Sequence, residues 1–176
     1  SRNIQVMNIR AVLLQNKGYS SADILRVASY ACSSKENFKE LMRCFLANEY
    51  RLAQRAAGSV SWAAKKKPAM VAPHIKEIVA QLERNDVHAA VIRNSVRVLE
   101  MIDIPESLHG DVMNACFTFI EKPSTPVAIK AFSLTTLFNL SKIYPDIRQE
   151  LKLIIKERWN DETPALKKKK KKILQM

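Results

Sequence analysis

The residue types that most often do chemistry in proteins are few and widely separated in this chain. The three histidines, His74, His88 and His109, lie 14 and 21 residues apart. Two imidazoles that bind one metal ion from a helix stand at positions i and i+4, and that spacing does not occur here. No Gly-x-Ser-x-Gly elbow or local cysteine–histidine signature indicates a nucleophile with its base. The sequence therefore predicts no metal, no cofactor and no catalytic residue.

The cysteines indicate a reducing compartment. Cys32, Cys44 and Cys116 are an odd number, lie far apart and form no Cys-x-x-Cys pair. This pattern favours neither a disulfide framework nor a structural zinc site. Apolar residues surround all three at helical spacing, so we expect buried, reduced thiols. The cysteines thus predict a cytoplasmic location.

Positive charge is the other conspicuous property of the sequence. The formal net charge is +12, and six of the positive charges come from the run Lys167–Lys172. We expect this run to be a solvated or disordered tail, although such a run also suits nucleic acid, an anionic membrane surface or an acidic protein. The sequence contains no apolar run of 18 residues, so it predicts no transmembrane helix. Ser1 is neither an initiator methionine nor the start of a signal peptide, so we expect a natural chain that is trimmed or extends before it.

The elements that would position any site are predicted to be helices. Only three glycines occur among 176 residues, and alanine, leucine, lysine and glutamate are abundant. The tight turns of β-sandwiches and the phosphate-binding loops of many enzymes need more glycine, because they require positive φ.

A repeat of 38 residues organises these helices. Residues that favour helix starts recur at Asn48, Asp86 and Ser124. Each is expected to accept a hydrogen bond from the free amides of a first helical turn.

Basic residues and prolines follow at matching positions. The basic residues are Arg55, Arg93 and Lys130, and the prolines are Pro68, Pro105 and Pro145. Because proline breaks a helix interior but is tolerated in its first turn, each proline marks a boundary between two helices. The first helices are expected over 49–65, 87–103 and 126–143. The second helices are expected over 69–84, 106–121 and 146–160.

Further helices flank the repeats. Upstream, a helix over 3–16 is expected to stop at Gly18, and Ser20–Ser21 and Ser34 are expected to start two more. Downstream, Thr163–Pro164 begins a lysine-rich helix or tail over 161–176. Leu166 and Ile173 lie seven residues apart, so one side of this segment could dock on the last helix pair. We expect about ten helices in a single domain over 1–176.

The segment Tyr50–Trp62 (YRLAQRAAGSVSW) resembles the first helix of a HEAT repeat, in which an arginine is followed by small residues. The second helix of that family often begins after a proline, as at Lys67–Pro68 here. Asn94–Ser95 and Ala131–Phe132 match less well, and Lys130 replaces the arginine, so the third repeat departs from the pattern. The resemblance covers roughly 35–160.

This resemblance implies an all-α fold, an α-α superhelix of HEAT-like helical hairpins forming a right-handed solenoid. The chain is also similar to small bacterial HEAT-like proteins, some of which are described as adenylosuccinate lyases. The Ser-rich, Met-Pro-Lys loop of that enzyme superfamily is absent from this sequence. In the HEAT pattern the repeated basic position contacts acids or carbonyls of the neighbouring repeat, which we favour over an anion-binding ladder.

The resemblance also implies that the second helices line a concave surface that binds partners. Each second helix has apolar residues at helical spacing on one side, and the candidate residues lie on or near the opposite side. They are Lys76, Glu77, Met113, Asn114, Phe117, Lys152 and Lys156. Lysines at both ends with Phe117 and Met113 between them would suit a peptide with an apolar anchor and acidic flanks. An ordinary solvated helix face is the alternative interpretation.

Three hypotheses for function follow. The first is a non-enzymatic scaffold or protein-interaction module with a protein or peptide partner. The second is non-specific nucleic-acid binding through Lys65–Lys67 and the C-terminal lysine run. The third is an enzyme similar to the HEAT-like DNA glycosylases, which would require a carboxylate beside an aromatic cleft. We expect Trp62 and Trp159 to pack in the core or at its rim instead.

Overall fold

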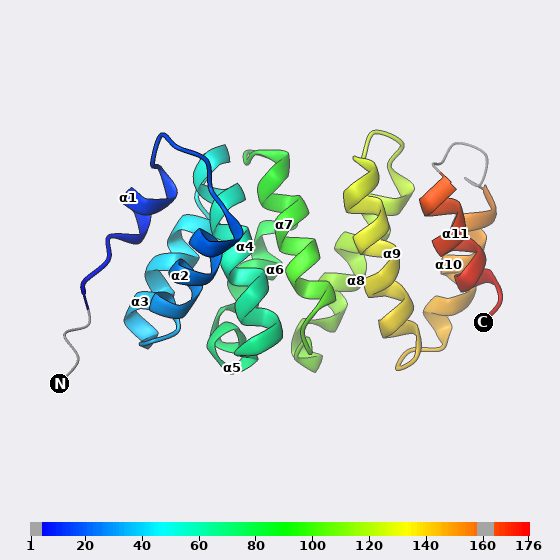
Figure 1. Ribbon diagram of the computed structural model, residues 1–176. Coiled ribbons are helices and arrows are strands. Elements are labelled where there is room, and N and C mark those ends of the chain that lie inside the picture. The colour runs from blue at the N-terminus through cyan, green and yellow to red at the C-terminus, as the bar shows by residue number, and fades with distance from the viewer. Residues whose placement is uncertain (1–4, 158–163) are drawn as a thin grey trace. The chain divides into compact units, whose positions relative to one another are not determined.

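The computed structural model describes residues 5–157 and 164–176, and all regular structure in these ranges is helical (Figure 1). Because α5, the 3₁₀ turn η1 and α6 follow one another without a break, the eleven described α-helices make ten helical segments. Their bounds are α1 (Ile9–Leu13), α2 (Ser21–Ala31), α3 (Lys35–Phe45), α4 (Tyr50–Lys66), α5 (Pro68–Val71), η1 (Ala72–His74), α6 (Ile75–Gln81), α7 (Ala89–Glu100), α8 (Glu106–Glu121), α9 (Val127–Ser141), α10 (Asp146–Glu157) and α11 (Pro164–Leu174).

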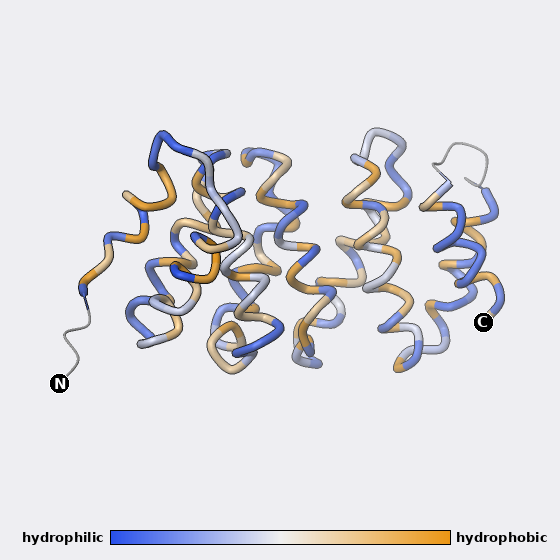
Figure 2. The backbone as a smooth tube through the Cα atoms, viewed as in Figure 1, coloured by the Kyte–Doolittle hydropathy of each residue, from blue (hydrophilic) through white to orange (hydrophobic). Residues whose placement is uncertain are grey.

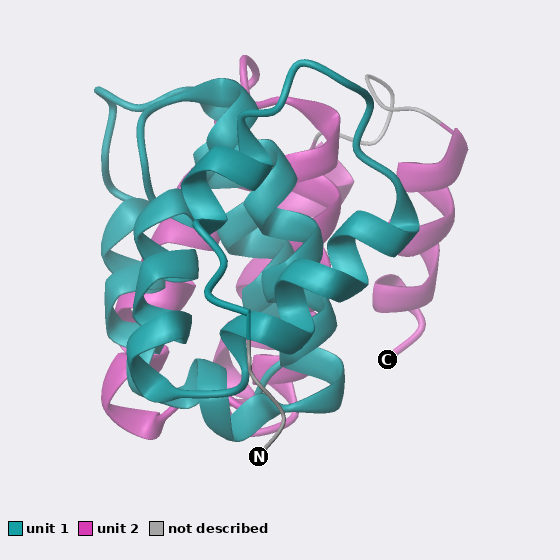
Figure 3. Cartoon of the chain, turned by 60° about the vertical axis from the view of Figure 1, so that its left-hand side comes forward, with its two compact units in different colours: residues 1–102 teal, residues 103–176 magenta. Residues whose placement is uncertain are grey.

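The chain consists of two compact units, residues 1–102 and 103–176 (Figure 3). The all-α fold and the helix pairs expected from the sequence are confirmed. A single domain over 1–176 stays a prediction.

Helix α4 is the centre of the first unit, where it packs against α1, α2, α3, α5 and α7. Its buried side is rich in alanine, with Ala53, Ala56 and Ala63 fully covered. Small side chains let neighbouring helix backbones approach closely, and the larger core side chains come from elsewhere, including Phe38 and Phe45 of α3.

Gly58 marks a close approach of α4 to α2. A Cβ atom at this position would lie 3.0 Å from Cδ1 of Ile24 on α2. The Ser59 hydroxyl also donates to the Ile24 carbonyl at 2.9 Å. A glycine in the middle of α4 therefore has a packing reason, even though it lowers helix propensity.

Helix α9 has the central place in the second unit and packs against α8, α10 and α11. Leu134 and Leu137 of α9 meet Leu151 and Ile155 of α10 in a core where all four side chains are at most 1% exposed.

The lysine-rich segment 164–174 is a helix, so the expectation of a solvated or disordered tail is wrong for these residues. Leu166 and Ile173 are 2% and 3% exposed, because their seven-residue spacing puts both on the side that packs on α9 and α10.

Several helix ends differ from expectation. The first described helix covers only Ile9–Leu13 and ends at Leu14, so Gly18 is not its stop, and no described glycine has a positive φ. The helix expected over 69–84 is interrupted at Ala72–His74, where Pro73 has no amide to donate. Ser20 and Ser34 cap α2 and α3 as expected. Thr163, Trp159 and the end of the helix expected over 146–160 lie outside the described residues.

Candidate partner-binding groove

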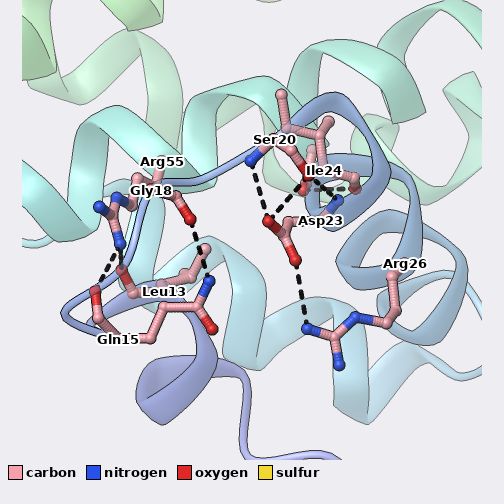
Figure 4. A network of polar contacts seen from close by, with 9 residues as sticks. Leu13, Gln15, Gly18, Ser20, Asp23, Ile24, Arg26 and Arg55 are labelled. Atoms are coloured by element: carbon pink, nitrogen blue, oxygen red, sulfur yellow. Dashed lines mark hydrogen bonds and ion pairs between the residues drawn. The ribbon is translucent and has the colours of Figure 1, made fainter.

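Arg55 joins the middle of α4 to the chain that leaves α1 (Figure 4). Its guanidinium donates to the carbonyl oxygens of Leu13, Gln15 and Lys17 at 3.0, 2.9 and 3.1 Å. It also lies over the Tyr19 ring, 5.4 Å from the centroid. These carbonyls follow a helix end and would otherwise lack partners, so the contact is structural.

The two later basic positions make different contacts. Arg93 of α7 donates to the side-chain oxygen of Gln54 on α4. Lys130 of α9 is 8% exposed, and its Nζ lies 3.5 Å from the Pro123 carbonyl oxygen. The repeated basic residue therefore contacts a neighbouring segment of the chain in all three repeats.

The expected helix-start role of the repeated polar residues is wrong. The residues before α4, α7 and α9 are Glu49, His88 and Pro126, and only His88 accepts a side-chain capping bond, from the Ala90 amide. Ser124 stands two residues too early, because Pro126 sets the start of α9.

Asn48 and Asp86 bond elsewhere. Asn48 spans to the next repeat, where its side chain bonds to backbone atoms of Asp86 and His88. The Asp86 carboxylate accepts two hydrogen bonds of 3.0 Å from Arg84, and this arginine holds the pKa of Asp86 below its usual range.

The residues expected to form a concave partner surface are divided between the two units. Lys76 and Glu77 are exposed on α6. On α8, Asn114 is exposed while Met113 and Phe117 are half-buried. Lys156 is exposed on α10. A single surface made of these residues stays a prediction.

The ammonium group of Lys152 already has a hydrogen-bond partner within its own unit. Its Nζ donates to the main-chain oxygen of Met176 at 3.0 Å, so the end of the chain covers this ammonium group. Sequence periodicity missed the contact because α11 packs on the side of α10 that was expected to be open.

A groove of about 460 Å³ lies in the first unit, on the side of α4 flanked by α2 and α7. Its lining residues are Ser21, Ile24 and Leu25 from α2, Gly58, Ser61, Trp62 and Lys65 from α4, and Arg97 from α7. Gly58 and Ser61 are small, so they leave room above the middle of α4 between the larger side chains.

The groove combines an apolar surface with positive charge. Leu25 is 49% exposed, and Trp62 and Ile24 are half-buried, so apolar area is accessible to a partner. Lys65 and Arg97 are exposed, and no acidic residue lines the groove. The arrangement can receive an apolar side chain and attract carboxylates beside it.

From the sequence, Trp62 was expected to pack in the core or at its rim, whereas in the structure it is half-buried and lines the groove together with Leu25. The stripe of α2 buries Val27, Ala28 and Ala31, and Leu25 lies about 100° from Ile24 around the helix axis. The only sequence signal for the groove was therefore that Leu25 is apolar but lies outside the buried stripe of α2.

The histidines have structural neighbours. His74 packs against Phe38, with ring centroids 5.5 Å apart. His109 donates from Nε2 to the Ile104 carbonyl at 2.7 Å and meets the Tyr144 hydroxyl at Nδ1 at 2.8 Å. No group of three or more histidine, cysteine or acidic residues gathers into a metal site in ranges 5–157 and 164–176.

The three cysteines are free thiols. Burial raises the pKa of Cys44 to about 11 and that of Cys116 to about 12, and it also raises the pKa of Cys32. A thiol with a raised pKa is a poor nucleophile at neutral pH, because the thiolate is the reactive form. In the described part of the chain, no helix is both long and apolar enough to span a bilayer.

Comparison with known proteins gives one match. The HEAT repeat domain model matches residues 11–176, which is nearly the whole chain. No curated protein and no solved structure matches the sequence. The match extends beyond the 35–160 expected from the sequence, and it adds α2 and the lysine-rich α11.

Proposed function

The chain belongs to the HEAT repeat family, and we propose that it is a non-enzymatic scaffold whose α2–α4–α7 groove binds an acidic segment of a partner protein. HEAT repeats commonly mediate protein interactions, so the family supports a binding role. The observation that carries the proposal is the accessible Trp62 and Leu25 beside Lys65 and Arg97. The free thiols support a cytoplasmic setting for this role.

The groove favours a partner of defined chemistry. An apolar or aromatic side chain of the partner would lie against Trp62, and its removal from water would supply most of the affinity. Asp or Glu residues beside this anchor would face Lys65 and Arg97. Exposed ion pairs contribute little affinity each, but they raise the association rate and select acidic partners.

The groove offers no support for a glycosylase-type enzyme. Such chemistry requires a carboxylate beside the aromatic side chain, and the residues around Trp62 in the groove are apolar, small or basic. Trp62 therefore serves as a contact surface for an anchor in this proposal.

A selected peptide tests the proposal directly. Peptides enriched from a random library on the full chain should share a Leu or aromatic anchor with flanking Asp or Glu. Their affinity should fall about tenfold or more in Trp62→Ala, because central aromatic contacts are worth about 2 kcal/mol or more. The double variant Lys65→Glu/Arg97→Glu should bind more slowly and lose its salt dependence.

Lys76→Glu is the matched control. Lys76 is exposed in the same unit but does not line the groove, so this charge reversal should leave peptide affinity unchanged. Equal losses in Lys76→Glu and in the double variant would contradict the groove and favour the α6 surface expected from the sequence.

A further inference from the structure

Helix α11 presents lysines on one side and packs with the other. Most of α11 is hydrophilic (Figure 2). Leu166, Lys170 and Ile173 are buried at helical spacing, whereas Lys168, Lys171 and Lys172 are exposed three and four residues apart. Residues three and four apart lie on one face of a helix. The exposed lysines therefore form a single face, which we name the α11 lysine face: Lys168, Lys171 and Lys172.

The rest of the unit holds this face in place. Lys169 donates from Nζ to the Ala131 carbonyl of α9 at 3.1 Å, and it lies 5.8 Å from the Phe132 ring centroid. The end of the chain is fixed by the bond from Lys152 to Met176. A rigid array of charges loses less conformational entropy when it binds than a flexible lysine tail does.

A further lysine, Lys142 at the C-terminal end of α9, extends the positive surface. The ammonium groups of Lys142 and Lys172 both lie over the Phe138 ring, at 4.8 and 5.9 Å from its centroid. Both cations are attracted to the same aromatic ring. Lys142 therefore adds to the charge beside the α11 lysine face.

This charge is not neutralised within the described residues. Neither Lys142 nor any member of the α11 lysine face forms an ion pair there, whereas the ion pairs found in those ranges involve Arg10, Arg26, Lys39, Arg43, His74 and Arg84 of the first unit. Concentrated positive charge without internal partners attracts a polyanion strongly at low salt.

The chemistry of the face distinguishes among polyanions. Leu166 and Ile173 of α11 are buried on the side that packs on α9 and α10, and the opposite side consists of lysines, so this side has no large apolar residue to insert into a membrane. The exposed groups are lysine ammonium ions, which contact phosphates as point charges. No arginine of α11 could read a base edge, because the helix contains none.

We propose that the α11 lysine face, together with Lys142, binds the phosphate backbone of double-stranded nucleic acid without reading its sequence. This proposal does not rest on the peptide groove, because all of its residues belong to the second unit. It takes the nucleic-acid hypothesis drawn from the lysine run and assigns it to an ordered helix face.

The test is the salt dependence of duplex binding by the full chain. A labelled 20-base-pair DNA of arbitrary sequence is titrated by fluorescence anisotropy between roughly 50 and 200 mM KCl. Four contacts should give a slope of about −3.6 in log affinity against log salt, or a loss of about a hundredfold over this range. A duplex of scrambled sequence should bind equally well.

Two triple variants separate a binding face from net charge. Lys168→Gln/Lys171→Gln/Lys172→Gln should reduce the slope by about 2.7, because about 0.9 is lost for each phosphate contact. Lys35→Gln/Lys66→Gln/Lys67→Gln removes three exposed lysines of the first unit that do not line the groove, and it should leave the slope unchanged. Glutamine retains helix propensity, and thermal unfolding checks that both variants are folded.

The proposal fails under three results. Equal loss of slope in both triple variants would show that only net charge matters. No duplex binding at 50 mM KCl would remove the interaction altogether. Tighter binding to vesicles of anionic phosphatidylserine than to the duplex, abolished by the α11 variant, would assign the face to a membrane surface.

Discussion

The side-chain amide of Asn48 donates to the main-chain carbonyl of Asp86 at 3.0 Å, and these two residues occupy equivalent positions one repeat apart. The oxygen of the same side chain accepts from the His88 amide at 2.8 Å. One asparagine thus satisfies a carbonyl and an amide of the turn that precedes α7. At this first step of the 38-residue repeat, the polar side chain therefore ties two consecutive turns together instead of capping a helix.

Asn48→Ala should lower the free energy of unfolding by about 1–2 kcal/mol, because two hydrogen bonds to the backbone are lost. Urea unfolding followed by circular dichroism measures this change. Asn48→Asp should have an intermediate effect, since it keeps the acceptor for His88 and loses the donor to Asp86. Asn85→Ala, in the same exposed turn, is the control, and a loss as large as that of Asn48→Ala would contradict the role of this pair.

Arg55→Ala should cost about 2–3 kcal/mol, because three carbonyl groups lose a charged donor. Arg55→Lys should recover only part of the loss, since a lysine cannot place a rigid fork on several carbonyls. Limited proteolysis after residue 14 should accelerate in both variants. Arg51→Ala, exposed on the same helix, should leave stability and cleavage unchanged; faster cleavage in this variant would argue against a local role for Arg55.

The helices were predictable because their signals are local. Proline positions and apolar stripes placed both ends of α4, α8 and α9 within two residues of the observed ends. Ser20 and Ser34 were recognised as caps because each is followed by a hydrophobic helical stripe and has no competing partner nearby.

Long-range contacts were not predictable from the same signals. Asn48 and Asp86 have side chains that suit a helix cap, but an asparagine amide can also bond to a distant backbone, and sequence spacing does not distinguish the two. The groove depends on which side of α4 is flanked by both α2 and α7. Sequence periodicity gives a helix its apolar face but not the neighbours that border its polar face.

Asp23 should make the start of α2 sensitive to acid. Hydrogen bonds from the amide and hydroxyl of Ser20, both 2.9 Å, hold the pKa of Asp23 below its usual range, and Arg26 contributes further. The resulting stability is present above the unfolded pKa, about 3.9, and is lost as the pH falls through the lower folded pKa.

The midpoint of thermal unfolding checks this dependence. Asp23→Asn should melt below the wild-type protein at pH 7, and the difference should close as the pH falls through the lowered pKa of Asp23 and the wild-type carboxyl becomes protonated too. Glu36→Gln, which alters an exposed ion pair with Lys39, should show little difference at either pH. If the two melting temperatures differed by the same amount at every pH, the charge of the Asp23 carboxyl would have no effect on stability.

The three thiols should react in a fixed order with a thiol-specific reagent. Cys32 is half-buried, whereas Cys44 and Cys116 are buried and have pKa values of about 11 and 12. At pH 8 their thiolate fractions are about one in a thousand and about one in ten thousand. We expect one fast-reacting thiol in the native protein and none in native Cys32→Ser. After unfolding, all three thiols of the wild-type chain should react fast. Labelling of Cys116 at the rate of Cys32 in the native protein would be inconsistent with the burial of Cys116.

Docking of α11 should contribute measurably to the stability of the second unit. Leu166→Ala and Ile173→Ala each remove a side chain that is at most 3% exposed, so each should cost about 2–4 kcal/mol of unfolding free energy. Leu153→Ala is the control, because Leu153 of α10 is 61% exposed and its loss should change stability by less than about 0.5 kcal/mol. If the lysine helix were only a solvated tail, all three variants would unfold at the same urea concentration as the wild-type chain. Hydrogen exchange would then show no protection for the amides of α11, whereas a docked helix should protect those beside Leu166 and Ile173 in the wild-type protein and release them in the two variants.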